Sequence, residues 1–174
     1  LRFAAGPAEP GVERWLCLDG LATVADVWLN GHRLLQSRGM FTAHECRVDE
    51  WLRPENELLL HFHSLDELLK AKRPRPRWRA PMVEHQQLRW FRTTLLGRTP
   101  GWSPPAAAVG PWREIRLEHR RGAILSHVRL QADGDGLRTA SCRGHIVGGG
   151  TLSGVSVEIE REGRIPGSFH CPRG

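Results

Sequence analysis

The sequence predicts an all-β protein, and three observations lead to that class. Most of residues 13–63 divide into short segments in which apolar and polar side chains alternate with the period of a β-strand. Asn30-Gly31 joins two such segments, and this dipeptide suits the positive φ angles of a type I′ hairpin turn. The apolar stretches are far shorter than the roughly 18 residues that a membrane-spanning helix requires, so neither a transmembrane segment nor a membrane partner is expected.

Six strands are expected in the first part of the chain, each bounded by turn residues. They cover residues 13–20, 23–30, 32–37, 41–48, 57–64 and 112–120. Residues 49–56 supply one helical turn that ends at Pro54, because proline has no backbone N–H to continue the helix. Ser64 and Glu67 have the spacing of a capping box, which predicts a brief helix that ends near Lys72.

The longest connection, residues 74–111, contains seven prolines, and only residues 83–96 are expected to have regular structure there. Connections of nearly forty residues inside compact domains are uncommon and often functional. Basic charge is concentrated in the same region. Residues 70–98 hold nine Lys or Arg against one acidic residue, a net charge of +8, whereas the whole chain carries +6. This connection is therefore the first place to look for a site.

The basic segment allows two interpretations. Tryptophans interleaved with basic residues are typical of single-stranded nucleic-acid binding. The alternation of arginine and proline in residues 73–79 instead favours an extended loop whose guanidinium groups are solvated or ion-paired. Because no helix-turn-helix, zinc-finger or RNA-recognition signature accompanies the segment, we favour the structural interpretation and expect no nucleic-acid partner.

The composition changes near residue 122. Three further strands are expected at residues 124–131, 139–147 and 155–160, and the tail 161–174 shows no strand period. Three strands are about half of an immunoglobulin-like sandwich, which takes roughly seven. We therefore expect a first domain at 1–121 and a partial immunoglobulin-like sandwich at 122–174. The first residue is Leu1 and four cysteines are widely spread, which favours a piece of a longer protein with reduced thiols in a cytoplasmic setting.

Three stretches of the sequence, residues 20–31, 40–64 and 110–118, resemble the N-terminal sugar-binding domain of glycoside hydrolase family 2, particularly its β-mannosidase-like members. They correspond to a strand ending in Leu-Asn-Gly, a turn of the form Leu-Arg-Pro-Gly-Glu-Asn, and a closing Gly-Ile-Trp before an alternating strand. Glu55 replaces the turn glycine and Pro111 the isoleucine. The resemblance covers residues 1–121 and implies a galactose-binding-like jelly roll, in which Trp28 and Trp112 are expected to pack between two sheets.

In that family the jelly roll and sandwich domains precede a (β/α)₈ barrel that holds the two catalytic glutamates of a retaining mechanism. A barrel needs about 250 residues, so we assign no catalytic residue to this 174-residue chain and expect it to be inert. No cofactor is expected. His61 and His63 share one strand face and His85 lies in the long loop, but no third ligand has a fixed spacing, so no metal site is expected either.

The resemblance also implies that the long loop reaches the barrel and helps to close the sugar pocket. Arg92 and Trp102-Ser103 occupy the positions of the family's pocket residues, but Ser103 stands where the family has an aspartate. A single hydroxyl cannot bind two sugar hydroxyls as a carboxylate does. Either the substrate preference differs from that of the family, or the pocket role passes to Gln86, Gln87 or Arg89. Trp102 could stack on a sugar ring or pack within the loop.

Trp78 and Trp90 are expected to pack within the loop. The leading hypothesis is a non-catalytic scaffold that braces the barrel and supplies residues 83–105 to a mannoside pocket. A free-standing carbohydrate-binding module is the alternative.

Overall fold

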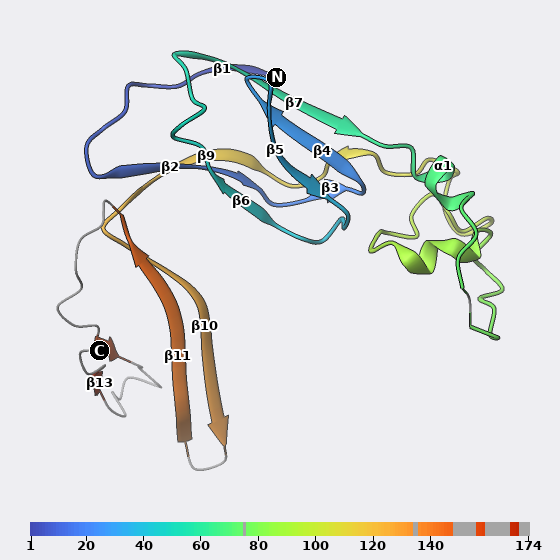
Figure 1. Cartoon of the computed structure of the whole chain (residues 1–174). Helices are drawn as coiled ribbons and strands as arrows, with labels where there is room; N and C mark the ends of the chain where they lie inside the picture. The colour runs from blue at the N-terminus through green and yellow to red at the C-terminus, as the bar shows by residue number, and fades with distance from the viewer. Residues whose placement is uncertain (75, 134–135, 148–155, 159–167, 171–174) are drawn as a thin grey trace. The chain divides into compact units, whose positions relative to one another are not determined.

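The computed structural model describes residues 1–74, 76–133, 136–147, 156–158 and 168–170 (Figure 1). These residues are mostly β-strand in antiparallel sheets, with little helix, as the sequence predicts. The chain forms two compact units. One comprises Leu1–Glu9 with Arg14–His119, and the other comprises Pro10–Glu13 with Arg120–Gly174. In the described part of the chain, no helix has the length and apolar character needed to cross a lipid bilayer.

The first unit contains three sheets. One has the order β1-β7-β4-β5 and consists of Arg2–Ala4, Glu55–Phe62, Ala25–Leu29 and His32–Ser37. A second has the order β6-β2-β9, from His44–Arg47, Val12–Leu18 and Ile115–Arg121. The third pairs the short strands β3 (Leu21–Ala22) and β8 (Gly110–Pro111). All six expected strands of this region are present, and β1, β3 and β8 are additional.

The core of the first unit receives side chains from both larger sheets. Its buried members come from β2, β3, β4 and β7 and from the residue after β6: Leu16, Leu18, Leu21, Ala25, Val27, Leu29, Val48 and Leu58. Burying one such leucine or valine stabilises a protein by about 1.5–3 kcal/mol. Alternation along β4 places Val27 and Leu29 in this core, so Asp26 and Trp28 lie on the opposite face of the sheet.

Trp28 and Trp112 do not lie between the sheets, so that expectation was wrong. Trp28 is excluded from the core because its neighbours Val27 and Leu29 occupy the inward positions. Trp112 is 39% exposed. Its Nε1 donates to the Met40 carbonyl at 2.7 Å, and its ring lies against the backbone of Gly20, where a Cβ atom would come within 2.4 Å of Nε1.

The Asn30-Gly31 hairpin forms as predicted. Both residues have positive φ angles, 51° and 87°, and Leu29 pairs with His32 across the turn. The Asn30 side chain also reaches a second turn. Its Nδ2 donates to Asn56 Oδ1 at 2.8 Å, and Asn56 is 3% exposed. The two asparagines of the sequence motifs therefore clamp two separate turns together.

The second unit contains two antiparallel strand pairs among its described residues. β10 (Ala123–Asp133) pairs with β11 (Gly136–Ile146), and β12 (Ser156–Glu158) pairs with β13 (Ser168–His170). The first two strands predicted for this region are confirmed. The third is described only over Ser156–Glu158. The tail was expected to lack a strand, but β13 lies in it, and three residues are too few to show a periodic pattern.

Candidate functional site

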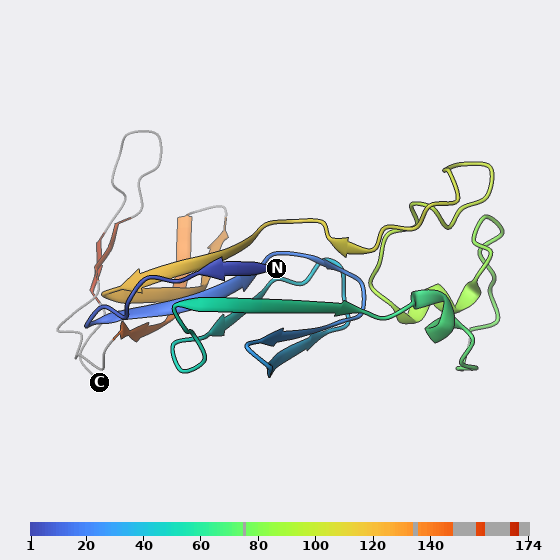
Figure 2. The same cartoon turned by 90° about the horizontal axis from the view of Figure 1, so that it is seen from above.

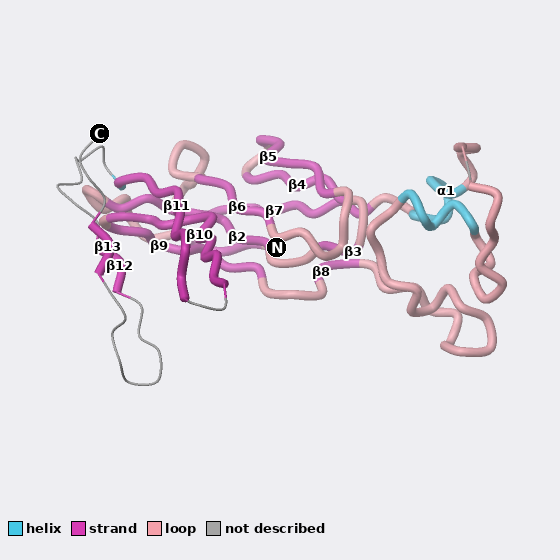
Figure 3. The backbone as a smooth tube through the Cα atoms, turned by 90° about the horizontal axis from the view of Figure 1, so that it is seen from below, coloured by secondary structure: helices cyan, strands magenta, loops and turns pink. Residues whose placement is uncertain are grey.

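The candidate site lies on a long excursion of the first unit, residues 65–109, which we call the arm. It leaves the sheet after β7, returns at β8, and extends from one end of the unit (Figure 2). Most of the arm is loop, with a five-residue helix α1 (Leu65–Leu69) and a short 3₁₀ helix η1 (Gln86–Trp90) (Figure 3). Ser64 caps α1 as predicted, because its Oγ accepts from the Glu67 N–H at 3.3 Å.

A small apolar cluster attaches the arm to the sheets. Leu65 and Leu69 of α1 pack with Leu88 of η1 and with Phe91, and all four are buried. Val24, which lies between β3 and β4, completes the cluster. The arm therefore has its own core, and one residue of the sheet region belongs to it.

Polar contacts add to this attachment. Arg92 forms an isolated parallel bridge with Gly39, and its carbonyl accepts from the Met40 N–H at 2.7 Å. Arg98 forms an ion pair with Asp66 of α1. The hydrogen bond from Arg98 lowers the pKa of Asp66 below its ordinary value, so the carboxylate is charged at neutral pH and holds the two ends of the arm together.

Gln86 and Arg89, both predicted as site residues, contact each other. Gln86 Oε1 accepts from Arg89 Nη2 at 2.8 Å and from the Ala80 N–H at 3.0 Å. Gln86 Nε2 donates to the carbonyls of Ala80 and Val83, at 2.9 and 2.6 Å. The Arg89 guanidinium lies 4.3 Å from the centre of the Trp78 ring. The amide of Gln86 is thus fully engaged in folding the arm.

These residues line a cavity of about 180 Å³ in the arm, and two polar atoms near it have no partner. The lining is mainly apolar and comprises Trp78, Ala80, Val83, His85, Gln86, Leu88, Arg89, Thr93 and Leu95. Gln87 Oε1 and Arg89 Nη1 are buried without a hydrogen bond. Sites for small molecules usually have roughly 300–1,000 Å³, so this cavity is smaller than a typical small-molecule site.

Trp102 and Ser103 lie at the tip of the arm. The Trp102 side chain is 76% exposed. Ser103 Oγ accepts from the Gly97 N–H at 2.9 Å, which braces the tip. Gly97 has a φ of +77°, and an added Cβ would come within 2.3 Å of the Ala106 carbonyl oxygen. Glycine is therefore required at this crossing of two backbone segments.

Arg92 presents its guanidinium to solvent, and no hydrogen bond or ion pair from the described residues engages it. The structure divides the other five predicted site residues into two groups. Gln86, Gln87 and Arg89 belong to η1, whereas Trp102 and Ser103 belong to the tip. Within the described ranges, no hydrogen bond or ring contact joins the two groups.

Exposed apolar side chains are concentrated on the arm, which sequence reasoning did not anticipate. They are Trp78, Met82, Trp90, Leu95, Leu96, Trp102 and Val109. Trp78 was expected to pack but is 63% exposed, and Trp90 is 46% exposed. The guanidinium of Arg89 covers one face of the Trp78 ring. The sequence feature that could have indicated this exposed apolar surface is the number of tryptophans in a proline-rich segment.

Comparison with known proteins places these features in a family context. The model of the family described as "Glycosyl hydrolase 2 galactose-binding domain-like" matches residues 2–113. Beta-mannosidase B of Thermothelomyces thermophilus is 33% identical over 120 residues, which are 67% of this chain and 14% of that protein. Beta-mannosidase B of Aspergillus clavatus is 33% identical over 136 residues, covering 73% of this chain and 16% of the relative.

The fold is also similar to part of a solved structure. The crystal structure of Beta-D-Mannosidase from Dictyoglomus thermophilum superposes with a TM-score of 0.63 at 22% identity, over 76% of this chain and 16% of that chain. The chain therefore spans about one seventh of the length of the relatives that it matches.

Proposed function

We propose that this chain, which belongs to the glycosyl hydrolase 2 galactose-binding domain-like family, is the non-catalytic N-terminal part of a β-mannosidase-like glycosidase. The whole enzyme hydrolyses O-glycosidic bonds by a retaining mechanism in a barrel that lies beyond this chain. Residues 1–121 form a galactose-binding-like jelly roll, and residues 122–174 form part of an immunoglobulin-like sandwich. Neither the catalytic glutamates nor a cofactor belongs to this segment.

The observation that carries this proposal is the construction of the arm. It is anchored by a buried cluster and by the bonds of Arg92 and Arg98, yet it presents exposed tryptophan and leucine side chains. An anchored element with an exposed apolar surface is typical of an interface. Its cavity is smaller than a sugar pocket. The partner that covers the arm and completes the pocket is the barrel of the same enzyme.

Within that pocket the tip supplies the sugar contact. The indole of Trp102 stacks on the apolar face of a mannoside ring. Arg92, whose guanidinium is solvent-exposed, binds a sugar hydroxyl or a carboxylate of the barrel. Ser103 positions the tip, and the unpartnered atoms of Gln87 and Arg89 are available to the barrel or the substrate. Gln86 holds η1 in shape.

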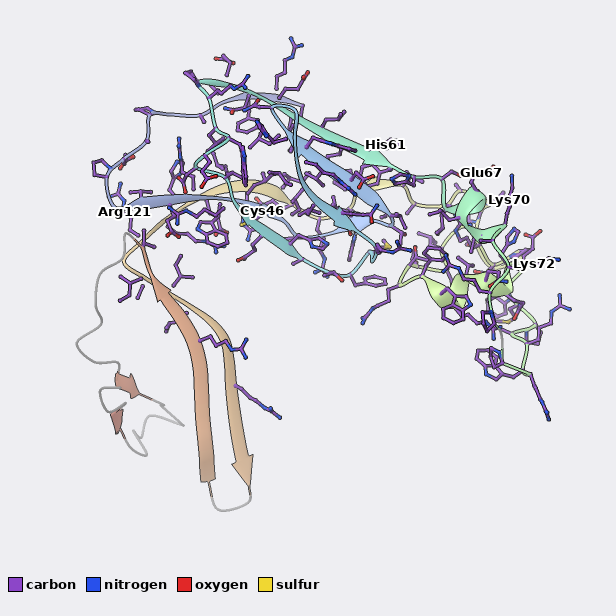
Figure 4. All side chains as sticks on the ribbon, viewed as in Figure 1. Cys46, His61, Glu67, Lys70, Lys72 and Arg121 are labelled. Carbon is purple, nitrogen blue, oxygen red and sulfur yellow. The ribbon has the colours of Figure 1, made fainter. Side chains whose placement is uncertain are left out.

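Four basic side chains of the arm, those of Lys70, Arg73, Arg89 and Arg98, have partners within it, which supports this proposal over nucleic-acid binding. Lys70 Nζ lies 2.7 Å from both carboxylate oxygens of Glu67, as the labelled side chains in Figure 4 illustrate. The guanidinium of Arg73 covers the Phe91 ring at 4.9 Å. Part of the basic charge is therefore engaged in contacts within the arm.

The test compares this chain with the full-length enzyme. We expect calorimetry with mannose and manno-oligosaccharides to detect no binding by the isolated chain. In the full-length enzyme, we expect Trp102→Ala to lower kcat/KM for an aryl mannoside about tenfold, roughly 1.4 kcal/mol. Trp90→Ala, which removes another exposed tryptophan of the arm, is the matched control and should have a smaller effect. Cleavage of the aryl mannoside by the isolated chain would overturn the proposal.

A free-standing carbohydrate-binding module is a second candidate, favoured by the exposure of Trp102. Stacking on an exposed indole needs no enclosing pocket. Saturable binding of manno-oligosaccharides by the isolated chain, abolished by Trp102→Ala, would support this candidate over the scaffold.

A further inference from the structure

A carboxylate and two imidazoles gather on the outer face of the four-stranded sheet, near the end of β7 from which the arm leaves. Asp26 of β4 and His61 of β7 are direct partners across the sheet. His61 and His63 are two residues apart, so their side chains lie on the same face. Figure 4 labels His61 near the end of β7. The backbone N–H of His63 donates to the Val24 carbonyl at 2.9 Å, which holds this residue beside β4.

The three side chains are close enough to share an ion. His63 Nε2 lies 2.6 Å from Asp26 Oδ2, and the rings of His61 and His63 have their centres 4.6 Å apart. One donor atom from each residue lies within 4.8 Å of the others. Metal–ligand distances of about 2.1 Å place two tetrahedral ligands roughly 3.4 Å apart. The longest separation must therefore shrink by about 1.4 Å, which the exposed His61 side chain can provide by rotation.

We propose that Asp26, His61 and His63 form a binding site for a divalent transition metal of the Zn²⁺ class. Two imidazole nitrogens and one carboxylate oxygen are ligands that Zn²⁺ prefers, and they suit alkaline-earth ions less well. Because His61 is exposed, the fourth position is open to water. The site needs no part of the sugar pocket and is independent of the proposed glycosidase function.

The surroundings of Asp26 fit this role. Its side chain is only 10% exposed, and its other oxygen, Oδ1, is bound by the Arg33 guanidinium. This contact fixes the carboxylate and leaves Oδ2 for the ion, as outer partners of metal ligands commonly do. Arg33 is also the cationic group facing the site and limits its affinity. Trp28 lies beside His61, with ring centres 6.4 Å apart, and forms an apolar flank.

Ion binding requires one rearrangement of protons. The hydrogen bond between His63 Nε2 and Asp26 Oδ2 must break, so that both atoms offer a lone pair to the metal. A proton on Nε2 moves to Nδ1 of the same ring, or is released to solvent if both nitrogens carry one. Because a proton and the metal compete for the same nitrogen lone pairs, binding is expected to weaken as the pH is lowered.

The first test is titration of the metal-free chain with ZnCl₂ in a calorimeter. We expect one site per chain with a micromolar dissociation constant. His61→Ala should weaken it at least tenfold without unfolding the chain, because this side chain is exposed. His119→Ala removes an exposed histidine of β9 and should bind as the wild type does. Absence of saturable binding, or equal loss in the two variants, would overturn the proposal.

The second test uses Co²⁺ as a spectroscopic substitute for Zn²⁺. We expect the visible absorption of a four-coordinate nitrogen and oxygen site, which His61→Ala and Asp26→Asn both abolish. Cys17 and Cys46 are free thiols, and thiolate ligation would add intense charge-transfer absorption in the near ultraviolet. Such absorption would assign the ion to cysteine and overturn the proposal.

Discussion

Replacing Asn56 by alanine should remove the clamp between the hairpin turn and the turn before β7. Asn56 is 3% exposed. Its Oδ1 accepts from Asn30 Nδ2 and from the Arg53 N–H, both at 2.8 Å, and its Nδ2 donates to the Arg53 carbonyl at 2.6 Å. Each bond contributes about 1 kcal/mol net, so Asn56→Ala should lower the free energy of unfolding by about 3 kcal/mol.

Urea denaturation followed by far-ultraviolet circular dichroism measures this loss. With a slope of about 1–3 kcal/mol per M urea, the midpoint should fall by roughly 1–3 M. The matched control is Glu57→Ala at the next position of β7. Its carboxylate is exposed and pairs only loosely with Arg2 at 3.5 Å, so the expected change is within about 0.5 kcal/mol.

A double-mutant cycle isolates the pair itself. Asn30→Gly removes the partner side chain but tolerates the φ of 51° at this position. Because Asn30 and Asn56 share one hydrogen bond, the double variant should lose about 1 kcal/mol less unfolding free energy than the sum of the losses in the two single variants. Strict additivity, or a loss below about 1 kcal/mol in Asn56→Ala, would refute the clamp as a stabilising feature.

Three further predictions concern the arm. Trp102→Ala should change the free energy of unfolding by no more than about 0.5 kcal/mol, since its side chain is 76% exposed, and a larger change in urea denaturation would show hidden packing. Gly97→Ala should accelerate hydrogen exchange at the residue-97 amide at least tenfold, roughly 1.4 kcal/mol, because its Cβ meets the Ala106 oxygen. Gly101→Ala shares the positive φ but meets nothing within 4 Å, so its effect should be smaller. The carboxyl of Asp66 should titrate below 3.8 by NMR and return toward this value in Arg98→Ala. Because its pKa is lowered on folding, its contribution to stability is present above pH 3.8 and is lost as the pH falls through the folded-state pKa.

Features that depend on neighbours in sequence could be predicted, and features that depend on sheet register could not. The Asn30-Gly31 turn and the Ser64 cap follow from local backbone chemistry, and both formed as expected. Asp26 and His63 are 37 residues apart, and only the antiparallel pairing of β4 with β7 brings them together. The sequence offered His61 and His63 as a pair but held no indication that Asp26 lies opposite them. For the same reason a metal site was not expected there.

The tryptophans show a second limit. The strand motif predicts a core position for Trp28, but Trp28 lies on the outer face because aliphatic residues occupy the inward positions on either side of it. Residue type alone therefore does not decide burial, whereas the position of the residue in the alternation of its strand does. The alternation that places Val27 and Leu29 on the inner face of β4 places Trp28 together with Asp26 on the outer face.

The substitution at Ser103 can be interpreted physically. The resemblance places an aspartate of the sugar pocket at this position, but the Ser103 hydroxyl accepts the Gly97 N–H and so holds the tip closed. With one lone pair committed to the backbone, Ser103 keeps one O–H donor and one further lone pair on a single atom, whereas a carboxylate would keep a second, separate acceptor oxygen. In the pocket that we propose, recognition of the sugar would therefore depend mainly on stacking by Trp102 and on the charge of Arg92. Such a site binds a ring face more strongly than a particular pair of hydroxyls, which predicts broader sugar selectivity than the family aspartate would give.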